Sequence, residues 1–139
     1  DITAPLYWWK EFDTYKLGVT SNSQSTMHKL CSRPLTVHDF SFEDMHDDEF
    51  IVNIVLDNLN ARIRDYKADM KQNKSLWRTI IQLLPCSYNQ TRTITMNYEN
   101  VINMYQQRKN HKLSEWREFC QYMYDNLDYC KILVDELEK

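Results

Sequence analysis

The segment from Asn22 to His28 carries hydroxyl and amide side chains at almost every position, in the order Asn-Ser-Gln-Ser-Thr-Met-His. Side chains of these types donate and accept hydrogen bonds, so they can hold a phosphate group or the polar edge of a uracil-like base. The same residue types are common in connections between helices and strands, where they cap and turn the backbone. On composition alone we favour the connection and keep the ligand site as the alternative.

A second set of polar side chains lies on one predicted helix near the C-terminus. Asn97, Asn100 and Asn103 recur at steps of three residues, and Arg108 follows about three helical turns after Asn97. Asparagine is a poor helix former, so several of them in one helix need an explanation. They either read the polar edge of a heterocycle or form a solvated helix face, and the residues alone favour neither.

Other common kinds of reactive site are not indicated. The four histidines (His28, His38, His46 and His111) form no HExxH sequence and no pair four residues apart, so we expect no metal site. The acidic residues from Glu43 to Glu49 are expected to form the solvated start of a helix. No serine or cysteine triad pattern is present.

Composition excludes several classes of protein. The chain has 139 residues but a single glycine, Gly18, where average usage predicts about ten. A Walker A loop and a GxGxxG fingerprint both need several glycines, so both are excluded, and a helix-rich single domain is expected. The net charge of −3 does not suggest a nucleic-acid-binding protein.

The cysteines and the apolar segments indicate an expected compartment. Cys31, Cys86, Cys120 and Cys130 form no CxxC pair, and we expect them to be reduced and mostly buried. No apolar run reaches transmembrane length and no signal peptide is evident, so the expected location is the cytoplasm, away from membranes. The sequence begins at Asp1 without a methionine. We therefore expect that an N-terminal portion precedes it.

Periodicity predicts mainly helices around these residues. Trp8, Trp9, Phe12 and Tyr15 recur at helical spacing within residues 5–16. The aromatic stripe of Tyr7, Trp8, Trp9 and Phe12 is expected to be core or an oligomer interface. A strand is expected to end at Pro5, a loop over 17–28, irregular structure over 34–46, and a loop or short strand over 86–95. Helices are predicted over 47–70, from Ser75 to Leu84, over 97–109 and over 114–137. The last helix is expected to turn its apolar residues inward, namely Phe119, Met123, Leu127, Cys130, Leu133 or Val134, and Leu137.

Taken in order, these segments resemble the motifs of the flavin-dependent thymidylate synthases. Ala4-Pro5 resembles the family's strand-to-helix A-P turn, and Thr14-Tyr15-Lys16 stands where the family has Arg-His-Arg. The segment Asn22 to His28 is similar to N-E-x-S-x-R-Y, and Leu84-Pro85 to L-P. Thr95-Met96-Asn97, Asn103 and Arg108 follow the register of T-x-N and N-x5-N-x4-R, and Glu115-Trp116-Arg117 resembles E-I-R. The resemblance covers nearly the whole chain.

This resemblance implies an α+β fold, with helices packed on a mainly antiparallel sheet and four identical subunits that form active sites between them. It implies the conversion of dUMP to dTMP with FAD, NADPH and methylenetetrahydrofolate. Ser25 and Arg108 would contact dUMP. Asn22, Asn97 and Asn103 would lie near the flavin or the nucleotide, and Lys16 would hold a phosphate.

Some positions depart from the family pattern, and they define an alternative. Met27 replaces an arginine directed at dUMP, Ser23 replaces a glutamate, and Thr14 replaces the first arginine of Arg-His-Arg. Each charged hydrogen bond lost from an anion site costs about 1.5–3 kcal/mol. The alternative is therefore a non-catalytic nucleotide-binding or assembly module on the same fold. An unrelated helical interaction protein, binding a partner through its aromatic face, is a third hypothesis.

Overall fold

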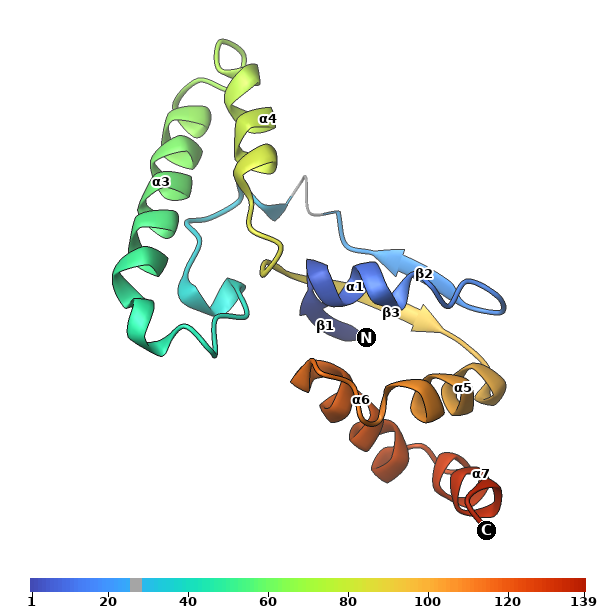
Figure 1. Cartoon of the computed structure of the whole chain (residues 1–139). Coiled ribbons are helices and arrows are strands. Elements are labelled where there is room, and N and C mark those ends of the chain that lie inside the picture. The colour runs from blue at the N-terminus through green and yellow to red at the C-terminus, as the bar shows by residue number, and fades with distance from the viewer. Residues whose placement is uncertain (26–28) are drawn as a thin grey trace. The chain divides into compact units, whose positions relative to one another are not determined.

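The computed structural model describes residues 1–25 and 29–139 (Figure 1). These residues contain six α-helices, two short 3₁₀ helices and a three-stranded sheet. In chain order the elements are β1 (Ile2–Pro5), α1 (Leu6–Phe12), β2 (Thr20–Ser23), η1 (Val37–Asp39), η2 (His46–Asp48), α3 (Glu49–Ala68), α4 (Lys74–Leu83), β3 (Asn89–Thr95), α5 (Tyr98–Arg108), α6 (Ser114–Asn126) and α7 (Cys130–Leu137).

The sheet is antiparallel and has the strand order β1-β3-β2. Two side-chain hydrogen bonds show the register of β1 on β3. The hydroxyl oxygens of Thr3 and Thr91 lie 2.7 Å apart, and the Thr93 hydroxyl donates to the carboxylate of Asp1 at 2.5 Å. The α+β, helix-rich class expected from the sequence is confirmed. The predicted loop over 17–28 was wrong in part, because it contains β2. All four residues of β2 are exposed, so no alternation of burial marked it as a strand.

The chain divides into two compact units. Unit 1 consists of Asp1–Ile2, Trp8–Asn22 and Thr93–Lys139. Unit 2 consists of Thr3–Tyr7 and Ser23–Arg92. Each unit has its own buried core, and the two are described separately below.

An aromatic cluster forms the core of unit 1. Trp8 and Trp9 of α1 make an edge-to-face contact at 4.9 Å between ring centroids, and Trp116 of α6 lies 4.6 Å from Trp8. Trp8, Trp9 and Phe12 are buried, which confirms that these three residues of the predicted aromatic stripe are core. The predicted helix over 114–137 is interrupted between Asn126 and Cys130, where the backbone leaves the helical conformation at Leu127.

Helices α3 and α4 of unit 2 lie side by side as a hairpin (Figure 1). The hairpin contributes three of the seven residues in the buried cluster of this unit, and the segment 30–40 contributes the other four. Leu59 and Ile63 of α3 and Ile80 of α4 are buried against the segment 30–40. The helix predicted over 47–70 is confirmed as α3. The helix predicted from Ser75 begins one residue earlier and is preceded by Asn73, so Ser75 is not its N-cap. It ends at Leu83, two residues before Pro85.

Two expectations from composition can be compared with the structure. Cys31, Cys120 and Cys130 are buried free thiols and Cys86 is exposed, which confirms that most of the cysteines are buried. Among the helices in residues 1–25 and 29–139, none has the length and apolarity needed to cross a bilayer. The inward position predicted for Leu137 was wrong, because 61% of its surface is exposed.

Candidate functional site

A polar cavity of about 370 Å³ lies within unit 2. Strand β3 and the segments before η1 contribute side chains that are mostly hydroxyls, amides and cations. The described residues that line it are Thr3, Gln24, Ser25, Lys29, Ser32, Arg33, Leu35, His38, Asp39, Tyr88, Asn89, Gln90 and Thr91. Of the described residues that the sequence predicted for a site, Gln24 and Ser25 are found here, and Ser25 is the one expected to contact dUMP. We call this space the Ser25 cavity.

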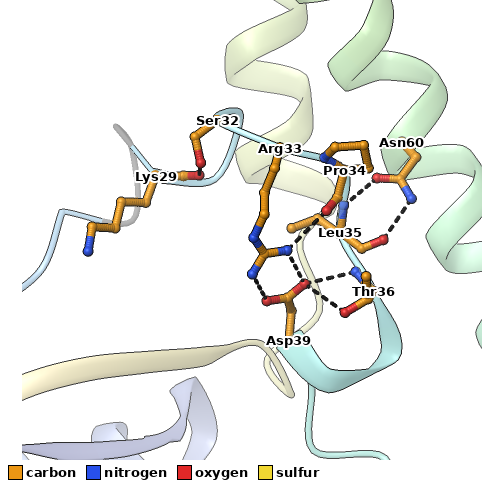
Figure 2. A network of polar contacts seen from close by, with 8 residues as sticks. All are labelled: Lys29, Ser32, Arg33, Pro34, Leu35, Thr36, Asp39 and Asn60. Carbon is orange, nitrogen blue, oxygen red and sulfur yellow. Dashed lines mark hydrogen bonds and ion pairs between the residues drawn. The ribbon is translucent and has the colours of Figure 1, made fainter.

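An ion pair between Arg33 and Asp39 forms one wall of the Ser25 cavity (Figure 2). Its geometry is bidentate, with Nη1 of Arg33 at 2.8 Å from Oδ2 and Nη2 at 2.6 Å from Oδ1 of Asp39. The backbone N–H of Thr36 donates to the same carboxylate at 2.8 Å. The hydrogen bond from Arg33 is the main reason that the pKa of Asp39 is lowered, so this carboxylate is ionised over the neutral range.

Two side chains of α3 hold the segment that carries Arg33: Asn60, and Lys67, whose Nζ donates to the carbonyl of Ser32 at 3.1 Å. Asn60 of α3 accepts from the backbone N–H of Leu35 at 2.7 Å and donates to its carbonyl at 2.9 Å (Figure 2). Both bonds are partly buried, so water competes with them less than with fully exposed bonds. This pair of hydrogen bonds fixes the backbone between the cavity and the helical hairpin.

The cavity carries a positive charge in its described lining. Lys29 and Arg33 contribute two cations, and Asp39 contributes one carboxylate. Lys29 also donates to the side chain of Gln24. A positive, hydroxyl-rich cavity of this size suits a small anionic ligand. Lys29 and Arg33 were not predicted as site residues, although two cations four residues apart follow directly after a polar segment of the sequence.

Arg108, the predicted nucleotide contact, is held within unit 1. Its Nη1 donates to Oε2 of Glu11 at 2.7 Å and its Nε to the Tyr15 hydroxyl at 2.9 Å. The guanidinium carbon lies 5.0 Å from the ring centre of Trp116, which is cation–π distance. Oε2 of Glu11 also accepts from Trp116 and lies 3.2 Å from Nε2 of His111. These bonds engage the guanidinium of Arg108 within its own unit.

The asparagines of α5 have structural partners. Asn97 is the N-cap of α5, where its side chain accepts from the backbone N–H of Asn100 at 3.0 Å. Asn100 donates to the carbonyl of Leu17 at 2.7 Å, and Asn103 accepts from the side chain of Gln107 at 2.8 Å. The expectation that Asn97 lies within the helix was therefore wrong, because it is the cap.

Lys16 and Asn22 have different surroundings in unit 1. Lys16 lines a hollow of about 240 Å³ together with Phe12, Asp13, Tyr15, Val19 and Ser21. Asn22 is exposed on β2. This hollow is smaller than the range of about 300–1,000 Å³ for ligand pockets, and Asp13 lines it beside Lys16, so the hollow does not by itself fit FAD.

Some predicted positions cannot be compared with the structure. Thr26, Met27 and His28 lie outside the described residues, so the effect of methionine at position 27 stays a prediction. Across residues 1–25 and 29–139, no group of three or more His, Cys, Asp or Glu side chains is arranged to hold a metal ion.

No protein-family model, curated protein or solved structure matches this chain.

Proposed function

We propose that the Ser25 cavity binds the phosphate and base of a uridine nucleotide such as dUMP. The observation that carries this proposal is the presence of Ser25, expected to contact dUMP, in a cavity that also contains Lys29 and Arg33. A phosphate is held well by one or two cations together with hydroxyl donors. The volume of about 370 Å³ lies at the small end of the ligand-pocket range, which favours a mononucleotide over a dinucleotide.

The amides of the cavity supply chemistry for the base. A uracil ring presents two carbonyl acceptors and one N–H donor, and an amide side chain both donates and accepts. Gln24 and Asn89 stand on the lining with the ring of Tyr88, which is half-buried. Stacking on an aromatic ring and pairing with an amide are the usual ways to hold a pyrimidine.

Binding by titration calorimetry tests this proposal. We expect dUMP to bind the wild-type chain. Lys29→Ala should lower the affinity for dUMP at least about tenfold, since a charged hydrogen bond contributes about 1.5–3 kcal/mol. The matched control is Lys71→Ala, an exposed lysine of unit 2 that does not line the cavity. Failure of dUMP, UMP and inorganic phosphate to bind would contradict the proposal, as would equal affinity in the Lys29→Ala chain.

The second candidate is the full thymidylate synthase reaction in the cytoplasm. The order of the motifs along the chain supports it, together with the family's practice of building active sites between subunits of a homotetramer. In that case FAD, with NADPH and methylenetetrahydrofolate, would supply the reduction and the one-carbon unit. Because the hollow around Lys16 is too small for FAD, this candidate requires contributions from other subunits.

Two measurements separate these candidates. The first is the visible absorbance spectrum after FAD is added and unbound flavin is removed by desalting. The second is the formation of dTMP from dUMP with all three co-reactants, followed by chromatography. A retained flavin band with dTMP formation supports the synthase. Binding of dUMP with neither a retained flavin band nor dTMP formation supports a non-catalytic nucleotide-binding module.

A further inference from the structure

The side of α3 that faces away from the core of unit 2 carries a regular series of residues. Val52, Leu59 and Ile63 of this helix are buried, whereas 74% of Phe50 and 41% of Ile54 are exposed. The residues on the outer side alternate at steps of four and three: Phe50, Ile54, Asp57, Ala61, Arg64 and Ala68. An average step of three and a half residues is the spacing of the contact seam in paired helices. We call this series the α3 seam.

The α3 seam is bulky at one end and small at the other. Its first two positions are Phe50 and Ile54, and its second half contains Ala61 and Ala68. Beside that second half lies a mostly apolar hollow of about 590 Å³, lined by Pro34, Asp57, Asn60, Ile63, Arg64, Lys67 and Ala68. The first half of the helix therefore carries large exposed apolar side chains, and a hollow beside the second half is available to accept such a side chain.

We propose that a second copy of this chain docks on the α3 seam, with the two α3 helices antiparallel. If Asp57 of one copy lies beside Ala61 of the other, Phe50 meets Ala68 and Ile54 meets Arg64. The contact is isologous, so each pairing occurs twice. The phenyl ring of each Phe50 then enters the hollow beside Arg64 and Ala68 of the other copy.

Charge determines both the orientation and the kind of partner. In a parallel pair, Asp57 would face Asp57 and Arg64 would face Arg64, so like charges would oppose each other. In the antiparallel pair, Asp57 of one helix lies within one turn of Arg64 on the other. An apolar partner would bury both charges without a counterion, at a high cost. A second copy of the same seam neutralises them.

Sedimentation velocity over a range of concentrations tests the contact. We expect the wild-type chain to assemble as its concentration rises, because two helices of about 30 Å form a small interface and therefore a weak dimer. Phe50→Asp should raise the dissociation constant at least about tenfold, since burying a phenylalanine contributes about 1.5–3 kcal/mol. It should leave the circular dichroism spectrum unchanged, because Phe50 is outside the core. The matched control is Tyr122→Asp on α6, where 61% of the side chain is exposed. A wild-type chain that stays monomeric overturns the proposal, and so does assembly that is unaffected by Phe50→Asp.

Disulfide trapping tests the orientation, in a background that carries Cys86→Ser. A mixture of Asp57→Cys and Ala61→Cys chains should form a mixed disulfide dimer within the dimer's lifetime. Ala68→Cys chains alone should crosslink far more slowly, because antiparallel helices hold these two positions about 27 Å apart. Rapid crosslinking of Ala68→Cys with itself would show a parallel pair and overturn the assignment. The antiparallel assignment would also be overturned if the mixed disulfide formed no faster than the disulfide between two Ala68→Cys chains.

Discussion

Glu11 and Arg108 are joined by an ion pair of 2.7 Å between Oε2 and Nη1, although they are 97 residues apart. The pair links α1 to the end of α5 within unit 1. Only 19% of the Arg108 side chain and 36% of the Glu11 side chain are exposed. The indole N–H of Trp116 donates to the same carboxylate oxygen at 3.1 Å. The pair therefore joins three helices of the unit.

Arg108→Ala is expected to destabilise unit 1 as its main effect. The change leaves the partly shielded Glu11 carboxylate without its closest cation and removes the stacking on Trp116. We expect the free energy of unfolding to fall by about 1–3 kcal/mol, measured by chemical denaturation. Lys10→Ala, at an exposed position of α1, serves as the control and should change stability little. A loss of nucleotide affinity with unchanged stability would contradict this structural role and return Arg108 to the ligand site.

The bidentate bond between Arg33 and Asp39 predicts how acid affects unit 2. Arg33 lowers the pKa of Asp39, so the carboxylate stabilises the folded state above its unfolded pKa of about 3.9. This stabilisation is lost as the pH falls through the lower folded pKa. Asp39→Asn should therefore cost of the order of 1 kcal/mol at pH 7, since 59% of the Arg33 side chain is exposed.

A pH series of denaturation curves checks this prediction for Asp39. The difference between the wild-type and Asp39→Asn chains should shrink below about pH 4, because the wild-type carboxyl becomes neutral there. Asp44→Asn, at an exposed position of unit 2, is the control. A difference between the wild-type and Asp39→Asn chains that stays constant down to the acid limit would show that the ion pair adds nothing to stability.

Sequence patterns predicted the helices of this fold better than its breaks. α3 begins within two residues of its predicted start because acidic residues favour a helix N-terminus and an apolar stripe follows them. The break between α6 and α7 was missed because no glycine or proline marks it. Cys130 and Val134, which follow the break, are buried. β2 was missed because its pairing with β3 is a non-local property.

The candidate site was predictable only where its signal was local. The dense hydroxyls and amides placed Ser25 among polar neighbours, and the structure gives it a polar cavity. The partners of Arg108 come from distant parts of the chain, so no short pattern indicated that they would engage it. The asparagines of α5 illustrate the same limit. Their spacing suggested a shared face, whereas Asn97 and Asn100 form a capping box.

Gly18 is the one glycine of the chain, and its backbone conformation explains why glycine stands at this position. Its φ is +72°, a conformation that side chains with a Cβ rarely adopt. A Cβ at this position would also lie 3.1 Å from Oδ1 of Asn100, whose side chain donates to the carbonyl of Leu17. We expect Gly18→Ala to lower the free energy of unfolding by about 1–2 kcal/mol. Ser21→Ala on β2 is the matched control in a thermal melt, and equal melting temperatures for the two variants would contradict the argument.

The four thiols should fall into two kinetic classes with a thiol reagent. Burial raises the pKa of Cys120 to about 11 and also raises the pKa of Cys31 and Cys130, so their reactive thiolates are scarce at pH 8. Cys86 is exposed. We expect one thiol to react rapidly with 5,5′-dithiobis(2-nitrobenzoate) in the folded chain and all four to react in guanidinium. Cys86→Ser should remove the fast phase alone. A fast phase that persists in this variant would show that a buried thiol is reached through local opening of its unit.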